Sequence, residues 1–235
     1  MKLAILALTL IGLYLIACYI LPNLYGRRLG SKLRQSLAEY CKEDQLILSF
    51  DDGPSAISPK LLDCLEHSSK RALFFMLASK LEKMDKQAAR SYLEALENAG
   101  HILGIHAYEH RLALKPWSSY QDLKRAYKVF RELGFKPRYL RPPHGFYNIG
   151  IILFAWRYGL RLVHWDSLLG DWKLEQSSQI LGKTQAAYHR AKSLGNLPVL
   201  IVMHDGCAGA ADPEAYRMCP TNTNLVLQWL QGSSR

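Results

Sequence analysis

The nine residues Leu46 to Pro54, LILSFDDGP, decide how the rest of the chain is interpreted. An apolar run of strand length ends there at two adjacent carboxylates, Asp51 and Asp52, and the chain-breaking pair Gly53 and Pro54 follows. Two like charges at the end of a buried strand raise the free energy of the fold unless a cation or strong donors offset them. A metal site with a second carboxylate beside it explains the pattern, and a solvated Asp-Asp-Gly turn is the alternative.

Apolar runs of strand length alternate with helical patterns through the rest of the chain. Strands are predicted at 46–50, 72–77, 102–106, 139–140, 160–165 and 199–203, and helices from 58 and at 87–99, 119–133, 151–157, 175–192 and 222–230. Ser119 and Asp122 resemble a capping box at one helix start. Continuous apolar strands between helices are typical of a parallel sheet covered by helices. The pattern therefore predicts an α/β fold of six to seven strands, either an open sheet or an incomplete TIM-like (β/α) barrel, with ligands at the carboxyl ends of the strands.

The composition excludes disorder and favours an anionic neighbour. The 235 residues are 49% hydrophobic and 21% charged, which fits one large single-core domain. Lysine and arginine exceed the acids by ten. This excess favours phospholipid, acidic glycan or phosphate-linked sugar, although basicity also serves solubility. Nucleic acid is not expected, because no basic and aromatic reader motif occurs. Protein partners are left open by the sequence.

The N-terminus differs in character from the rest. Residues 3–21 carry no charge, and Pro22 is expected to end the apolar segment. Its length just spans a hydrocarbon core. We interpret residues 1–22 as a membrane anchor, 23–44 as a basic linker and 45–235 as the catalytic domain. A cleaved secretory signal and a lipoprotein signal with Cys18 as the acylated residue are the alternatives.

The side of the membrane stays open. Four basic residues, Arg27, Arg28, Lys32 and Arg34, follow the apolar segment and favour a cytoplasmic catalytic domain. Short anchored enzymes are commonly exported, which favours the other side. Cys207 and Cys219 could close a small loop in an oxidising compartment, or could be small buried hydrophobic residues.

Polar side chains stand at five strand ends: Asp51 with Asp52, His106 with His110, Arg141, Asp171 with Trp172, and His204 with Asp205. On a helical turn, residues four apart share a face, so His106 and His110 can meet one ion. With Asp52 they form a ligand set suited to one divalent cation, zinc or alternatively cobalt or manganese, with positions left open. Two histidines and one carboxylate also occur in non-haem iron oxygenases.

The remaining polar residues can be assigned roles in proton transfer around such a metal ion. Asp51 can take a proton from water as a general base, and Arg141 offsets its charge. His204 can protonate the leaving group, and Asp171 can orient it and keep its pKa high.

Five ordered motifs resemble the polysaccharide deacetylases, the NodB-homology carbohydrate esterases. The motifs are Phe50-Asp-Asp-Gly53, His106-Ala-Tyr-Glu-His110, Arg141-Pro-Pro143, Asp171-Trp172 and Val202-Met-His-Asp205, and the resemblance covers residues 45–230. It implies a distorted (β/α) barrel that hydrolyses N-acetyl or sometimes O-acetyl groups on sugars. By the same resemblance Asp51 is the base, His204 is the acid, and Asp52, His106 and His110 are the metal ligands. Arg141 steadies the base, and Asp171 tunes His204. The resemblance further implies that Trp172 and Val202 wall the acetyl pocket, and that the segment of Pro143 and His144 binds substrate through a backbone N–H.

The chain departs from the family pattern at four positions. His144 replaces a tyrosine, Ala107 a serine or threonine, Ile105 a polar residue and Leu168 an aspartate. None of these removes a metal ligand, so we expect an active hydrolase. The expected substrate is an acetylated amino sugar of a polysaccharide or lipid-linked glycan at the membrane. An O-acetyl esterase and a catalytically impaired glycan-binding protein are the alternatives.

Overall fold

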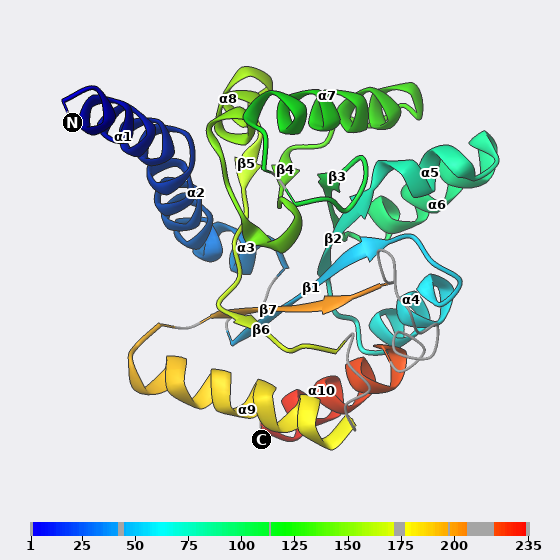
Figure 1. Ribbon diagram of the computed structural model, residues 1–235. Coiled ribbons are helices and arrows are strands. Elements are labelled where there is room, and N and C mark those ends of the chain that lie inside the picture. Colours follow the sequence, from blue (N-terminus) through cyan, green and yellow to red (C-terminus); the bar gives the residue numbers. More distant parts are fainter. Residues whose placement is uncertain are drawn as a thin grey trace.

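A computed structural model describes residues 2–41, 45–112, 114–171, 177–196, 198–205 and 219–233. Its centre is one parallel sheet that curls into an incomplete barrel (Figure 1). The strand order is β5-β4-β3-β2-β1-β7-β6, so β5 and β6 are the two edges. The strands are β1 (Leu46–Gly53), β2 (Ala72–Leu77), β3 (Ile102–Ala107), β4 (Tyr139–Leu140), β5 (Arg161–Leu162), β6 (Ser167–Leu168) and β7 (Val199–His204). The predicted fold is confirmed.

Helices cover the outer face of the sheet. They are α4 (Ser58–His67), α5 (Ala78–Lys83), α6 (Lys86–Asn98), α7 (Pro116–Glu132), α8 (Ile149–Tyr158), α9 (Ser177–Ser193) and α10 (Cys219–Ser233). Because side chains alternate along a strand, β1 turns Leu48 and Phe50 to this outer core and Ile47, Ser49 and Asp51 to the barrel interior. The interior is apolar at one end and polar at the carboxyl ends of the strands.

A short helix, α3 (Arg34–Cys41), packs on the apolar end of the barrel interior. Its side chains Leu37, Ala38 and Cys41 are buried against Ile47 and Leu200 of the strands, together with four further residues, Leu73, Phe75, Ile102 and Val163. Burying these side chains removes apolar surface from water, so α3 stabilises the same domain that carries the polar strand ends.

The N-terminal helix continues through Pro22, the residue at which the apolar segment was expected to end. It consists of α1 (Lys2–Leu15), a π-helical turn (Ile16–Ile20) and α2 (Leu21–Lys32). The Leu21 N–H donates to the Ile16 carbonyl five residues back. This wider turn precedes Pro22 and takes up the hydrogen-bond pattern that a proline interrupts, so the helix runs on beyond the apolar segment.

The segment expected to be a basic linker is helical in its described part and packs closely on the domain. A side chain at Gly26 would lie 2.4 Å from the Tyr147 ring, and one at Gly30 would lie 2.5 Å from the His164 backbone. Asn23 also accepts a hydrogen bond from the Tyr147 N–H at 3.2 Å. The close approach depends on glycines, which carry no hydrophobic signal in a sequence. The domain boundaries themselves stay a prediction.

Smaller differences have local causes. The predicted strand at 160–165 pairs only over β5, whereas β6 and α5 were not predicted. The capping box was wrong: α7 begins at Pro116, and the Asp122 carboxylate instead accepts the N–H groups of Tyr108 and Glu109. These bonds fix the loop that follows β3.

Candidate active site

The end of β1 brings two adjacent carboxylates into one site. Successive side chains of a strand normally point to opposite faces. Here the pairing with β2 is irregular between Asp51 and Gly53, and Asp52 has a φ of +69°. Such a bulge re-aims a side chain. A Cβ at the next residue, Gly53, would lie 2.5 Å from a carboxylate oxygen of Asp205, so glycine at this position allows the close approach of the two segments.

Three side chains form a candidate metal site at the carboxyl ends of β1 and β3. Asp52 Oδ1 lies 3.4 Å from His106 Nε2 and 3.8 Å from His110 Nε2. All three ligand atoms lie within 4.8 Å of one another. The expected helical turn was wrong: His106 lies in β3 and His110 in the loop after it. The bend of this loop brings the ring centres of His106 and His110 to 5.3 Å from each other.

The chemistry of these residues fits a divalent cation. Asp52 Oδ1 is buried and has no hydrogen-bond partner among the described residues, and a buried acceptor of this kind needs a ligand. His106 Nδ1 lies 2.7 Å from the Arg141 carbonyl, and donation to it leaves Nε2 free to bind a metal. Burial lowers the pKa of His106, and burial with the nearby His144 lowers that of His110 to about 4. Both imidazoles are therefore neutral at pH 7, as metal ligands must be.

Asp51 is held in a buried ion pair beside this site. Its Oδ1 accepts a hydrogen bond from Arg141 Nη1 at 2.8 Å, and the same nitrogen donates to Ser49 Oγ at 2.9 Å. Arg141 is fully buried, and its guanidinium lies 4.2 Å from the centre of the Phe75 ring. Burial alone would raise the pKa of Asp51, but the Arg141 charge and the nearby imidazoles lower it below its usual range.

His204 and Asp171 form a second polar pair at the end of β7. His204 Nδ1 lies 2.8 Å from Asp171 Oδ1, and the His204 backbone N–H donates to the other carboxylate oxygen at 2.7 Å. Burial would lower the pKa of His204, but the Asp171 carboxylate, with Asp51 and Asp52, raises it to about 9. The imidazole is therefore charged at pH 7.

The predicted substrate-binding residues are placed only in part. Pro143 is buried in a short 3-10 turn, whereas His144 is exposed, has a φ of +57° and lies edge-on to the His110 ring at 4.5 Å. Val202 is buried in β7, two residues before His204 and so on the same face of the sheet. Trp172 and Cys207 lie outside the described residues. Cys219 is a buried free thiol.

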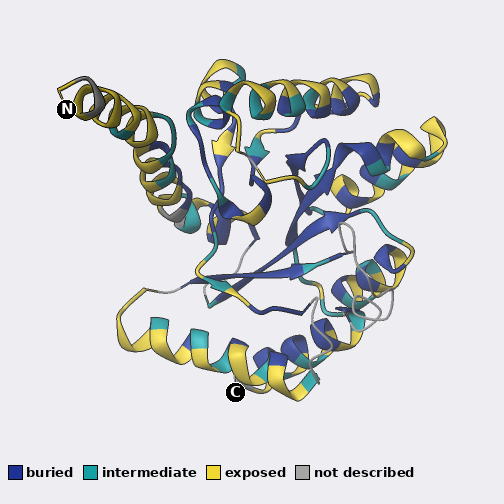
Figure 2. Cartoon of the chain, viewed as in Figure 1, coloured by how far each residue is buried: buried dark blue, intermediate teal, exposed yellow. Residues whose placement is uncertain are grey.

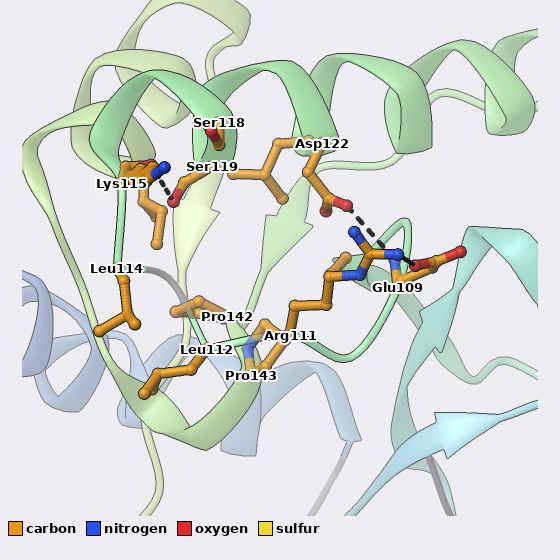
Figure 3. Close-up of a pocket in the computed structure, with 13 residues that line it drawn as sticks. Glu109, Arg111, Leu112, Leu114, Lys115, Ser118, Ser119, Asp122, Pro142 and Pro143 are labelled. Carbon is orange, nitrogen blue, oxygen red and sulfur yellow. Dashed lines mark hydrogen bonds and ion pairs between the residues drawn. The ribbon is translucent and has the colours of Figure 1, made fainter. Parts of the chain in front are cut away.

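A pocket of about 150 Å³ lies beside the loop after β3, and its lining includes Ala107 and Glu109, the chain neighbours of the two metal-site histidines (Figure 3). Pro142 and Pro143 form one wall, and Ala107, the loop after β3, the first half of α7 and Ile151 of α8 form the rest. Of the departures from the family pattern, Ala107 lines this pocket, whereas Ile105 is part of the outer core. The apolar character of Ile105 is therefore explained by packing.

The sequence did not assign a role to Asp205, which anchors the loop after β1. Both of its carboxylate oxygens accept from Ser58 Oγ, at 2.8 and 2.7 Å, and Tyr92 and Ser55 lie at 3.4 Å. Burial raises the pKa of Asp205 to about 7, although the bond from Ser58 lowers it. The sequence shows that Asp205 follows His204 at a strand end. It does not show the hydrogen-bond partners of Asp205, because they lie about 110 to 150 residues away in the chain.

Comparison with known proteins identifies the family of the chain. Residues 39–163, more than half of the chain, match the family described as polysaccharide deacetylase, and the chain belongs to this family. The resemblance drawn from the five motifs is confirmed.

Two curated relatives and one solved structure illustrate the likeness. A peptidoglycan-N-acetylglucosamine deacetylase of Bacillus cereus is 32% identical over 55% of this chain and 46% of its own length. The peptidoglycan-N-acetylglucosamine deacetylase PgdA of Listeria monocytogenes is 29% identical over 68% of this chain and 32% of its own length. A family 4 carbohydrate esterase from Streptomyces lividans, solved with acetate, superposes with a TM-score of 0.63 at 25% identity, over 81% of this chain and 89% of that one. The chain spans about half the length, or less, of the curated relatives that it matches.

Proposed function

We propose that this chain is a metal-dependent hydrolase that removes the N-acetyl group from an amino sugar of a glycan. The observation that carries the proposal is the ionised, arginine-bound Asp51 beside an unpartnered Asp52 oxygen and two neutral imidazoles. This is a base next to a cation site. The relatives named as peptidoglycan-N-acetylglucosamine deacetylases support the amide of an N-acetyl sugar as the bond that is cleaved.

Asp52, His106 and His110 would hold the metal, which we assign as zinc with cobalt or manganese as alternatives. When bound, a divalent ion of this kind polarises a carbonyl oxygen and lowers the pKa of water. The Arg141 carbonyl fixes the ring of His106, so that its Nε2 faces the site. The π-system of Phe75 and the charge of Asp51 hold Arg141 in turn.

The two titrating groups divide the proton transfers. Asp51 is ionised at neutral pH because of Arg141, and since Oδ1 is bound to the guanidinium, Oδ2 accepts the proton of the attacking water. His204 is protonated because of Asp171, and since Nδ1 is bound to that carboxylate, Nε2 carries the proton for the departing amine nitrogen. We propose that Val202 and Trp172 wall the pocket for the acetyl methyl, and that a backbone N–H of the Pro143–His144 turn binds the substrate.

We propose in addition that the N-terminal helix anchors the enzyme. Ile5–Gly30 is a helix long and apolar enough to span a membrane, with a mean hydropathy of 2.3 in its most apolar part. A cleaved signal sequence would have the same composition. The N-terminal mass of the mature protein distinguishes the two. Protease accessibility of the domain in intact cells then decides between the cytoplasmic side, favoured by the basic residues of α2, and the exported side.

Acetate release tests the chemistry directly. The substrates are peptidoglycan, chitin oligomers, acetylxylan and a lipid-linked N-acetylhexosamine, each with and without chelator. We expect release from at least one N-acetyl substrate, its loss with chelator, and a loss of about 100- to 10,000-fold in Asp51→Asn. Asp63→Asn, an exposed carboxylate of α4, is the matched control and should keep full activity. Release from acetylxylan alone, or glycan binding without any release, would overturn the proposal in favour of an esterase or an impaired binding protein.

A further inference from the structure

Exposed apolar side chains gather on one side of the domain. Among the described residues that follow the π turn, large exposed apolar side chains lie on α2, on residues 112–117 and on α8, with three exceptions: Tyr40, Leu168 and Leu194. The most exposed are Trp156 of α8, at 80%, and Trp117, at 70%. Apolar surface gathered in this way indicates an interaction site. We call α2, the described part of residues 112–117 (Leu112 and residues 114–117) and α8 together the docking surface.

The three segments of the docking surface are neighbours. Pro116, at the start of α7, meets the start of α8 so closely that a Cβ at Gly150 would lie 1.9 Å from its carbonyl oxygen. On its other side α8 faces α2 across an apolar groove of about 410 Å³, lined by side chains that include Tyr25 and Trp156. The docking surface is therefore continuous from residues 112–117 across α8 to α2.

The docking surface is also attached to the helix that we propose spans the membrane. Tyr19, in the π turn of that helix, donates a hydrogen bond to the Leu114 carbonyl at 2.6 Å, and its ring lies 6.3 Å from that of Phe146. Figure 1 shows α1 leaving the domain as the continuation of α2, and Figure 2 shows most of the described residues of α1 as exposed. A bilayer that contains α1 must therefore lie next to this side of the domain.

The composition of the docking surface fits a bilayer surface in particular. Tryptophan and tyrosine are the residues that proteins place at the membrane interface, and Tyr25, Trp117 and Trp156 are exposed here. Exposed basic residues accompany them on the same segments or next to them, among them Arg28 and Lys115. Such charges near an anionic surface favour binding to it.

We propose that the docking surface seats the domain on an anionic bilayer, so that its substrate is an amino sugar carried by a membrane lipid. This deepens the proposed function and rests on its membrane anchor. Leu112 follows the metal-site residue His110 after one intervening residue, Arg111, and Leu112 and Leu114 line a pocket beside the loop that carries His110 (Figure 3). A sugar attached to a lipid in the plane of the bilayer would reach the site across these residues.

Tryptophan quenching tests the docking surface in the full-length chain. The chain is reconstituted into phosphatidylglycerol vesicles that contain phosphatidylcholine with brominated acyl chains. Because two of the five tryptophans lie on the docking surface, emission should fall by roughly two fifths relative to unbrominated vesicles. The double variant Trp117→Phe, Trp156→Phe should lose this quenching, and Trp229→Phe, on α10, should keep it. Equal quenching in the wild type and the double variant would overturn the proposal that this surface contacts the bilayer. A wild-type chain that is not quenched and elutes as a dimer would overturn it as well.

A second measurement tests the substrate class. Trp156→Glu should reduce kcat/KM on the order of tenfold for lipid-linked N-acetylglucosamine in vesicles, and should leave the rate on soluble N-acetylglucosamine oligomers unchanged. An equal loss on both substrates would overturn the assignment of a lipid-carried sugar. A chain that separates from the vesicles would refute the anchor and the docking surface together. A chain that releases no acetate from either substrate would refute the hydrolase, while quenching would still decide the docking surface.

Discussion

Replacing Asp171 by asparagine should move the alkaline limb of the pH–rate profile. In the wild-type chain the Asp171 carboxylate lies 2.8 Å from His204 Nδ1 and raises the pKa of that imidazole to about 9 against the opposing effect of burial. Asparagine has no charge, so it no longer offsets the lowering of the His204 pKa by burial. The pKa of His204 should therefore fall towards 6.5. Because His204 acts as an acid, activity is lost as the pH rises through this pKa.

The size of the effect depends on the pH of the assay. At pH 8 an acid with a pKa of about 9 is roughly 90% protonated, whereas one with a pKa of about 6.5 is roughly 3% protonated. The variant should therefore be about 30-fold slower at pH 8. At pH 6 both forms are mostly protonated, and the loss from protonation should be less than about twofold.

Acetate release from an N-acetylglucosamine oligomer between pH 5 and pH 10 measures this shift. Asp166→Asn is the matched control, because Asp166 also accepts a backbone N–H of β7, that of Leu200, but is paired with Arg34. Its alkaline limb should stay where the wild type has it. An Asp171→Asn profile with its alkaline limb still near 9, or an equal displacement in the control, would refute the pairing as the source of the His204 pKa.

Three further predictions concern stability, measured by unfolding. Arg141→Met should cost about 3–5 kcal/mol, because it leaves the buried Asp51 charge unpaired, and an unchanged unfolding midpoint would contradict this. Gly30→Ala should destabilise the chain by about 1–3 kcal/mol through overlap with the domain, whereas Gly182→Ala, in open space on α9, should not. The folded-state pKa of Asp205, about 7, lies above its unfolded value, so wild-type stability should fall as the pH rises from about 4 to 7. Asp205→Asn should flatten this dependence, and equal slopes in wild type and variant would rule out Asp205 as its source.

The polar strand ends could be predicted because a parallel sheet places the carboxyl ends of all its strands at one edge. Residues that follow apolar runs in the sequence, such as Asp51, His106 and His204, are therefore neighbours in space. The same argument identified Arg141, although not the Ser49 hydroxyl and Phe75 ring that hold it. Those contacts depend on the register between strands far apart in the sequence.

Features that depend on backbone conformation or on glycine contacts were not predictable in this way. The positive φ of Asp52, which turns its carboxylate towards the histidines, has no signal beyond the glycine that follows it. The docking of α2 depends on Gly26 and Gly30, which the sequence shows only as small residues in a basic segment. The continuation of the helix through Pro22 required a π turn that no hydrophobic pattern predicts.

Zinc titration of the metal-free, full-length chain tests the central claim most directly. Asp52, His106 and His110 should bind one equivalent of Zn²⁺, and either Asp52→Ala or His110→Ala should weaken binding by more than about 100-fold. Asp51→Asn should still bind one equivalent, because Asp51 is bound to Arg141 and does not act as a ligand. Zinc binding that survives in Asp52→Ala with wild-type affinity would contradict the account.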